Sequence, residues 1–320
     1  MQDKIKLEAV LEGKERIDIY LKNAAGVSRG AVQKYIDARN VFINGKPAEN
    51  YHTKIKNGDI IEYTPEVPRE EKLEPSDISL DVIYEDEHML VINKQAGLVV
   101  HPSAGHSGET LVNAMLGRYI KEEDFTGHGN RLGIVHRLDK DTSGVMMAAK
   151  NDDSHLKLSG LFKSREIKKI YTALVHGEVE QEGFVNTTIT RDLRDRMKYT
   201  AKLMSGKDAQ TIFTPAESFY QATLLKVQIL TGRTHQIRVH MSHLKHEIAG
   251  DQMYGSSQKD TEMVKYLGYD AKSASDLLPR QMLHATTLSF VHPYTNKKME
   301  FKAPLAPDFE KIVGMLRKKV

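Results

Sequence analysis

Asp139 is the first candidate for chemistry, because it lies in a polar stretch between two apolar runs. Gly133-Ile134-Val135 precedes residues 136–144, and Val145-Met146-Met147 follows them. Apolar runs of this length favour short buried strands, so we expect two strands around a tight loop that holds Asp139. Asp, Ser and Gly are also the usual turn residues, so an ordinary hairpin turn without a chemical role is the competing interpretation.

Three other clusters carry polar side chains that could act together with Asp139. Lys94 follows an apolar run, Lys169 and Tyr171 lie at the start of another, and residues 232–238 read Gly-Arg-Thr-His-Gln-Ile-Arg. His235 and Arg238 are three residues apart, so on a helix they would lie on neighbouring faces. A surface turn for Lys94, and structural roles at a helix start for Arg233, His235 and His240, remain open.

A metal site is one alternative, because histidines 235, 240, 243 and 246 lie close together in the sequence. On a helix of about 3.6 residues per turn, His235 and His240 diverge by roughly 140°. No carboxylate falls at helical spacing from this set until Glu247 and Asp251. These observations argue against zinc.

Two further site classes lack their motifs. The chain has no Gly-x-Ser-x-Gly nucleophile elbow and no Gly-x-x-x-x-Gly-Lys phosphate loop. What remains is a loop carboxylate, Asp139, with arginines available to keep it ionised. An ionised and oriented carboxylate can act as a nucleophile on a sugar or on an activated ring.

The elements that must position these residues are strands and helices in irregular order. A turn carrying Lys94 is expected after the second strand, and residues 190–207 are expected to be irregular or hairpin structure at the surface. Because strands outnumber helices and do not alternate strictly with them, a mixed α+β sheet is favoured over a doubly wound parallel one. We expect strands at 82–84, 89–93, 169–175, 222–230, 283–291 and 299–302, and helices at 109–120, 151–167, 308–318 and from a Thr234 cap to Leu244.

Composition sets further limits. A chain of 320 residues with 40% hydrophobic content can form two domains with their own cores. It has no cysteine, which excludes disulfides and thiol chemistry and fits a reducing, cytoplasmic location. No signal peptide or membrane-spanning apolar run is found. The formal net charge is only +3, so nucleic acid binding must be argued from where the charges lie.

Residues 1–64 are expected to form a small separate domain. A helix behind a Ser28 cap is followed by a strand near Val41–Ile43, an Asn44-Gly45 hairpin turn and a strand near 58–63. Three proline residues among acidic ones then predict an interdomain linker at 65–79, ahead of a second domain at 80–320.

The motifs of residues 1–64 resemble the S4-like (alpha-L) RNA-binding domain. They are Arg16-Ile17-Asp18, residues 27–36 and residues 41–46. The resemblance implies that Arg29 and Lys34, on the basic helix, contact RNA phosphates, which position RNA without reading its sequence. A merely solvated helix face is the alternative for these two side chains.

Residues 136–144, His-Arg-Leu-Asp-Lys-Asp-Thr-Ser-Gly, resemble the signature of the RluA/RluD family of RNA pseudouridine synthases. One departure is Gln95, where the family often has proline, and this difference affects the local turn rather than the chemistry. Together with the amino-terminal domain the match covers nearly the whole chain. The other matching motifs occur in family order: Asn93-Lys94-Gln95-Ala96-Gly97 with His101-Pro102, Lys169-Ile170-Tyr171, residues 232–240 and Leu283-His284-Ala285.

This resemblance implies a catalytic domain built on a mixed, mainly antiparallel sheet with flanking helices. It also implies that the protein isomerises uridine in RNA to pseudouridine, with neither metal nor cofactor. Asp139 would be the nucleophile, paired with Arg238, while Tyr171 would pack on the flipped uracil and help to move a proton. Arg137 would fill the gap left by the extruded base, since flipping unstacks it. His136, Lys94, Lys169, Arg233 and His235 would contact the RNA.

The main hypothesis is therefore a monomeric, cytoplasmic pseudouridine synthase that modifies large-subunit (23S) ribosomal RNA. A transfer RNA substrate is the alternative within the same enzyme class. A non-catalytic RNA-binding factor in ribosome assembly is the alternative from another class. Asp139, Tyr171 and Arg238 argue against it, because a pure RNA binder has no evident use for all three.

Overall fold

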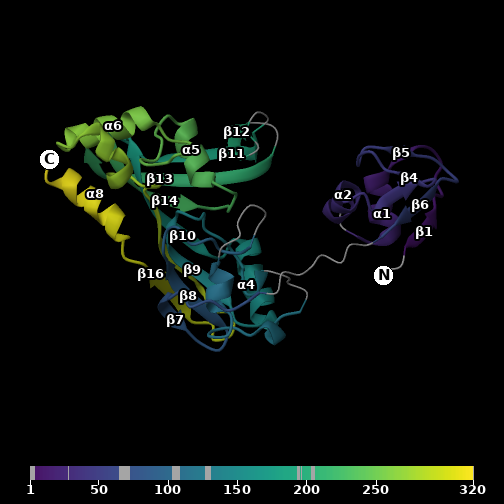
Figure 1. The fold of residues 1–320 in the computed structure, drawn as a ribbon. Coiled ribbons are helices and arrows are strands. Elements are labelled where there is room, and N and C mark those ends of the chain that lie inside the picture. Colours follow the sequence, from purple (N-terminus) through teal and green to yellow (C-terminus); the bar gives the residue numbers. More distant parts are fainter. Residues whose placement is uncertain are drawn as a thin grey trace. The chain divides into compact units, whose positions relative to one another are not determined.

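The computed structural model describes residues 4–27, 29–64, 73–102, 109–126, 131–192, 195, 197–202 and 206–319. The chain divides into two units, Met1–Glu71 and Lys72–Val320, each drawn in its own part of the colour range in Figure 1. Residues 65–72 of the expected linker and the expected helix cap Ser28 lie outside the described residues.

The first unit combines two helices with a small antiparallel sheet. Asn44 and Gly45 both have positive φ, 51° and 78°, which confirms the tight Asn-Gly turn expected between β3 and β4. Helix α1 lies in a stretch for which no helix was predicted. The elements are α1 (Ile17–Ala25) and α2 (Arg29–Asp37), the sheet β1 (Ile5–Glu8), β6 (Ile60–Tyr63), β3 (Val41–Ile43) and β4 (Lys46–Pro47), and the pair β2 (Glu15–Arg16) and β5 (Lys54–Ile55).

A ten-stranded sheet forms the framework of the second unit, in the order β12-β11-β13-β14-β10-β15-β9-β8-β7, with β16 paired to β15. The β9–β15 pair is parallel and the other recorded pairs are antiparallel, so the expected α+β class with a mainly antiparallel sheet is confirmed. The strands are β7 (Asp81–Glu85), β8 (Met89–Lys94), β9 (Ser143–Ala149), β10 (Lys168–His176), β11 (Gly183–Arg191), β12 (Tyr199–Lys202), β13 (Lys207–Phe219), β14 (Ala222–Ile229), β15 (Leu283–Val291) and β16 (Lys298–Lys302).

Helices flank this sheet. Helix α4 packs beside β8 and β9, whereas α6 and α8 lie together at the other end of the unit (Figure 1). In the part of the chain that the structure describes, no helix is long and apolar enough to cross a membrane. The helices are α3 (Leu111–Met115), α4 (Asp152–Ser164), α5 (Gln236–His243), α6 (Ser257–Tyr266), α7 (Ala274–Leu277) and α8 (Pro307–Arg317), with 3-10 turns at Glu122–Asp124 and Ala271–Ser273.

Strand β9 is the centre of the core, because all seven of its residues are buried. Its continuous apolar run packs with β8, β10 and β15 in one large cluster, and a second cluster fills the space under α6 and α8. Burial of the apolar side chains of these strands stabilises β9 and its neighbours, and so fixes the position of the polar loop that precedes β9.

Two expected elements differ from the structure. The helix expected at 109–120 ends at Met115, because Gly117 takes a left-handed φ of 79° and Leu116 turns out to bridge Ile120. The strand expected at 133–135 is absent from the described loop, where Ile134 forms only an isolated bridge to Ala148. Parallel pairing of β15 occupies the edge of β9 at Ser143 and Gly144, so a hairpin partner cannot lie there.

Candidate active site

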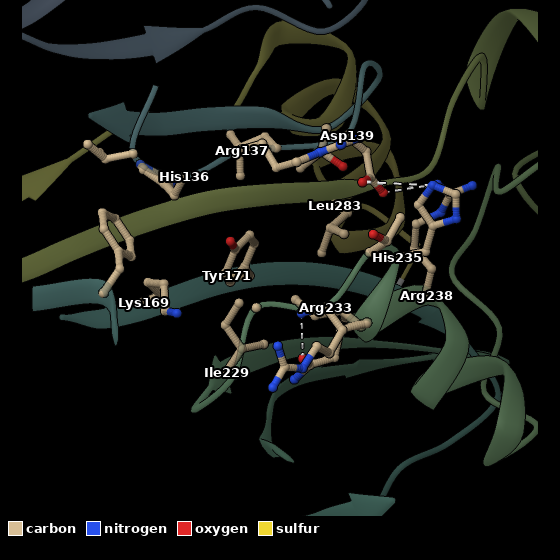
Figure 2. Close-up of a pocket in the computed structure, with 18 of the residues that line it drawn as sticks. His136, Arg137, Asp139, Lys169, Tyr171, Ile229, Arg233, His235, Arg238 and Leu283 are labelled. Atoms are coloured by element: carbon tan, nitrogen blue, oxygen red, sulfur yellow. Dashed lines mark hydrogen bonds and ion pairs between the residues drawn. The ribbon is translucent and has the colours of Figure 1, made fainter. Parts of the chain in front are cut away.

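A cavity of about 390 Å³ brings together nearly all the residues predicted for chemistry in the second unit. Figure 2 shows their side chains converging from the loop before β9, from β10 and from the start of α5. Lys94 is the exception, since it does not line the cavity. The predicted residues that do line it are His136, Arg137, Asp139, Lys169, Tyr171, Arg233, His235 and Arg238.

The loop that carries Asp139 is held by the strand that follows it. The backbone N–H of Thr142 donates to the Asp139 carbonyl at 3.1 Å and closes a turn. At Gly144, φ is 113° and an added Cβ would lie 2.2 Å from the Ala285 carbonyl oxygen, so only glycine permits β9 to approach β15 here. Buried Leu138 packs into the core beside the turn. These contacts fix the backbone while the Asp139 side chain stays 17% exposed.

Arg238 pairs with Asp139 across the cavity. Its Nη1 donates to Asp139 Oδ2 at 3.0 Å, marked by one of the dashed lines at Asp139 in Figure 2. Its Nε and Nη2 donate to both oxygens of Asp251, at 2.7 and 2.8 Å. Burial works against the charged guanidinium, but hydrogen bonds and charge from Asp251, and the charge of Asp139, raise the pKa of Arg238. The cation is therefore permanent and oriented.

Asp251 was missed as a site residue from the sequence, where it was considered only as a metal ligand. It is buried, and besides Arg238 it accepts the backbone N–H groups of Met253 and Tyr254. Burial raises its pKa, yet the bonds and charge of Arg238 outweigh burial and hold the pKa of Asp251 below its usual value. In the sequence, Asp251 follows the apolar pair Ile248-Ala249 by two residues. This is the signal that could have placed its charge near the core.

His235 begins helix α5 in a way that the sequence did not predict. The expected Thr234 cap is wrong, because His235 occupies the cap position in a left-handed conformation with φ 55°. Instead the Gln236 side-chain oxygen accepts the Arg233 backbone N–H at 3.0 Å and stabilises the start of the helix. This geometry turns the His235 ring into the cavity, with Nε2 3.9 Å from Asp139 Oδ1.

The His235 ring also meets Tyr254, another residue missed from the sequence. His235 Nδ1 and Tyr254 Oη are 2.9 Å apart, and the Arg238 guanidinium lies 5.1 Å from the centre of the Tyr254 ring. Burial lowers the pKa of His235 although the charge of Asp139 opposes the shift, and burial raises the pKa of Tyr254 to about 12. Both side chains are therefore neutral at neutral pH.

Tyr171 lies on β10, opposite the loop that carries Arg137 and Asp139 (Figure 2). The pairing of β10 with β15 shifts register between Ile170 and Tyr171, which is a bulge at the point where the side chain enters the cavity. Burial, and to a smaller extent the charge of Asp139, raise the pKa of Tyr171. Its hydroxyl thus stays protonated near the carboxylate.

Lys169 and His136 line the same cavity beside Phe162. Burial and the charges of Arg165 and Arg233 lower the pKa of Lys169 to about 8. Burial lowers the pKa of His136 to about 3, and its Nε2 accepts the Met147 backbone N–H at 2.9 Å. His136 is therefore a neutral ring stacked on Phe162 at 4.5 Å, and Lys169 is the titrating cation nearby.

Lys94 requires a correction, because it is neither a surface turn residue nor placed to contact RNA. It ends strand β8 with a fully buried side chain. Its Nζ donates to the carbonyl oxygens of Gln95, Leu98 and Lys140 at 2.9–3.0 Å, and burial lowers its pKa to about 7. The ammonium ties the end of β8 to the turn of Asp139, since Lys140 is the next residue after it.

The remaining predicted residues keep accessible charges. Arg137 is exposed at the cavity, and Arg233 Nε donates to the Asp208 carbonyl at 2.8 Å. In the first unit, Lys34 is exposed, while Arg29 pairs with buried Asp18 at 2.7 Å and remains 49% exposed.

Three of the four histidines considered as metal ligands, His235, His240 and His246, have other partners. His240 lies within hydrogen-bond distance of Thr187 and Thr211, and burial lowers its pKa to about 4. Among the residues with described positions, no group of three or more His, Asp or Glu side chains is arranged to hold a metal ion.

Comparison with known proteins yields two family matches. Residues 88–243 match the model described as RNA pseudouridylate synthase, and residues 15–61 match the S4 domain, which confirms both resemblances noted in the sequence.

Individual relatives match over most of their length. The chain is 40% identical to an uncharacterised RNA pseudouridine synthase of Bacillus subtilis (strain 168) over 95% of both chains. It is 37% identical to ribosomal large subunit pseudouridine synthase D of Escherichia coli (strain K12), over 91% of this chain and 86% of that protein. Human RNA pseudouridylate synthase domain containing 4 is similar in structure, with a TM-score of 0.57, 25% identity and coverage of 74% of this chain and 93% of that one.

Proposed function

The chain belongs to the RNA pseudouridylate synthase family, and we propose that it isomerises uridines of large-subunit ribosomal RNA with Asp139 as the nucleophile. Pseudouridine synthase activity on RNA, an isomerisation, follows from family membership. The choice of ribosomal RNA rests on the relative named for the ribosomal large subunit and on the S4 domain, which suits a large structured RNA.

One observation carries the assignment of the nucleophile. The Asp139 carboxylate faces the cavity, and the permanent cation of Arg238 lies 3.0 Å from it, with Asp251 fixing that cation from behind. The guanidinium orients the carboxylate in the cavity, and an oriented carboxylate can act as a nucleophile. A cavity of about 390 Å³ is in the size range of small-ligand sites and accommodates a single flipped nucleoside.

The proposed reaction conserves all the atoms of the substrate. Asp139 attacks either the ribose carbon 1′ or the uracil ring, and the bond between uracil nitrogen 1 and carbon 1′ breaks. The base rotates, carbon 5 bonds to carbon 1′, and the bond to Asp139 breaks, which frees the carboxylate. Carbon 5 loses its proton and nitrogen 1 gains one. Tyr171 packs on the base and its protonated hydroxyl assists the proton movement, which suits its raised pKa.

The uridine reaches the cavity by base flipping, which costs a few kcal/mol and least in loops. Exposed Arg137 then occupies the place left in the RNA. Lys169, Arg233 and His235 contact the substrate around the cavity, and Arg29 and Lys34 hold phosphates elsewhere in the same RNA. Charges on both units thus position one large RNA, whereas the cavity itself receives one nucleotide.

The test uses transcripts labelled with tritium at carbon 5 of uridine, because formation of pseudouridine releases this tritium to water. The purified full chain should release tritium from a 23S ribosomal RNA transcript and not from a transfer RNA pool at equal uridine concentration. Release from transfer RNA alone would contradict the proposed substrate, and release from neither would contradict the enzymatic assignment. Pseudouridine mapping in a strain lacking the protein then identifies the positions.

A further inference from the structure

A second cavity, of about 400 Å³, lies beside the first. The two cavities share Gly232, Arg233 and Thr234 as a common wall. The other side of the second cavity is made by the sheet edge, where β11 ends at Arg191 and β12 begins at Tyr199. A polymer with one unit in the first cavity therefore has a neighbouring unit within reach of the second.

The second cavity has a positive lining. Arg191 and Lys207 are exposed and Arg233 is half-buried on the shared wall, and no carboxylate is among the described residues that line it. Arg233 is held in place by its bond to the Asp208 carbonyl. Three cations around one cavity without a neutralising acid favour an anionic ligand.

The same cavity offers flat faces for a base. Arg191 and Tyr199 are paired residues of neighbouring strands, and the guanidinium lies 5.9 Å from the centre of the Tyr199 ring. Aromatic rings and guanidinium planes are the side chains on which unstacked bases pack. Phosphate-binding cations and a stacking surface thus occur together.

A chain of contacts joins this cavity to the candidate nucleophile. The Tyr199 backbone N–H donates to Tyr254 Oη at 2.8 Å, and Tyr254 Oη lies 2.9 Å from His235 Nδ1. The Tyr199 ring also meets the His235 ring edge-on at 5.7 Å, and His235 Nε2 is 3.9 Å from Asp139. A ligand that packs against Tyr199 therefore contacts a residue that touches His235, the neighbour of the Asp139 carboxylate.

We propose that the second cavity binds the nucleotide adjacent to the target uridine in the RNA chain. Lys207 and Arg191 hold its phosphate, and its base packs against Tyr199. The proposal rests on the proposed function for its ligand. Because phosphate contacts and base stacking are tolerant of sequence, the cavity contributes affinity and placement of the RNA rather than recognition of one base.

The charge component is tested by RNA binding, in Asp139→Asn protein so that no turnover occurs. Affinity for a fluorescein-labelled 23S ribosomal RNA transcript is measured at several KCl concentrations for Lys207→Gln and for Lys202→Gln. Lys202 is an exposed lysine on β12 that does not line the cavity, and Lys207 begins β13. Both strands pair with β11, so both variants lose one charge from the same part of the sheet. Lys207→Gln should weaken binding about tenfold and lower the slope of log affinity against log salt by about 0.7–0.9. Lys202→Gln should change neither by more than about a third as much.

The stacking component is tested at Tyr199 in the same assay. Tyr199→Leu removes the ring and should weaken binding about tenfold, in the range found for single stacked bases, while Tyr199→Phe keeps the ring and most of the affinity. In the active background, KM for tritium release should rise in the same ratio as the dissociation constant. If Tyr199→Leu does not fold, the comparison of Lys207→Gln with Lys202→Gln tests the proposal.

Equal effects of Lys207→Gln and Lys202→Gln would overturn the proposal, since the charge would then act as general surface potential. Equal losses in Tyr199→Leu and Tyr199→Phe would also overturn it, because the ring would have no part in binding. Failure of the proposed function is distinguishable. In that case the wild-type chain releases no tritium, whereas the difference between Lys207 and Lys202 in binding persists.

Discussion

Replacing Asp251 by asparagine tests how the structure keeps Arg238 in position. Asp251 accepts two charge-assisted bonds from Arg238, at 2.7 and 2.8 Å, and neither side chain is more than 8% exposed. Asparagine keeps the size of the side chain but offers one acceptor and no charge. Asp139 would then be the one carboxylate that neutralises Arg238 among the partners described above, and Arg238 would lose one of its two bonds to residue 251. Burial of the guanidinium would cost more free energy, and its orientation would be less fixed.

The size of the effect on stability follows from these contacts. Losing one charge-assisted bond and half of the neutralisation of a buried arginine should lower the free energy of unfolding by about 2–3 kcal/mol. This is less than the roughly 3–5 kcal/mol for removing one partner of a buried ion pair completely, because asparagine keeps one acceptor. For a unit of this size that corresponds to a decrease in Tm of about 5–10 °C. The pKa of Asp251 is lowered on folding, so its contribution is present above about pH 4 and is lost as the pH falls through the folded value.

The control is Glu217→Gln, which breaks an Arg–carboxylate pair of similar geometry at the surface. Glu217 pairs with Arg317 through both oxygens, and these side chains are 38% and 52% exposed. An exposed pair contributes about 0–1 kcal/mol, so the Tm of this variant should fall by less than about 3 °C.

Measurements of activity separate a positioning role of Asp251 from a role in stability alone. Tritium release is measured at 25 °C, where both variants are folded. Asp251→Asn should lower kcat about 10–100-fold, because small displacements of a catalytic constellation cost about that much, while KM changes less than about threefold since Asp251 does not line the cavity. A normal kcat together with the expected loss of Tm would refute a positioning role, and an unchanged Tm would refute the stability argument.

Three further changes probe other parts of the site. Tyr171→Phe should lower kcat about a hundredfold with little change in KM, as expected for a group that helps to move a proton, and kcat within threefold of wild type would contradict this. RNA affinity should fall between pH 7 and 9 as Lys169 loses its proton near its pKa of about 8, and Lys169→Arg should flatten that profile when binding is followed by fluorescence anisotropy. Lys94→Met leaves three carbonyls without their donor and should lower the free energy of unfolding, measured with urea, by about 3 kcal/mol. An unchanged urea midpoint would argue against a stabilising role of these three bonds.

Local patterns predicted the loop of Asp139 and the strands that the site depends on. Residues 145–149 form a continuous apolar run, and the structure buries them in β9, while Lys169 and Tyr171 lie on a predicted strand. These residues could be placed because strand formation by buried apolar residues is decided locally. Long strands with many exposed positions were missed: in β11, Asn186, Thr187 and Thr188 interrupt the alternation of apolar and polar residues.

The partners of the site residues depend on contacts between distant segments, which a single sequence does not contain. Lys94 can be buried because the carbonyl of Lys140, 46 residues later, accepts a hydrogen bond from its Nζ. Asp251 becomes a site residue only because α5 brings Arg238 beside it. The position of His235 likewise follows from a left-handed φ, a conformation that is uncommon outside glycine and that local propensity did not predict.

Tritium release by Asp139→Asn tests the central claim most directly, with Asp141→Asn as the matched control. The two carboxylates lie two residues apart in the same turn, and both substitutions remove one negative charge with little change in size. Of the two, Asp139 is the one that lines the cavity and bonds to Arg238. Asp139→Asn should bind the 23S transcript with near wild-type affinity and release no tritium, while Asp141→Asn should remain active. Undiminished release by Asp139→Asn would contradict its role as the nucleophile.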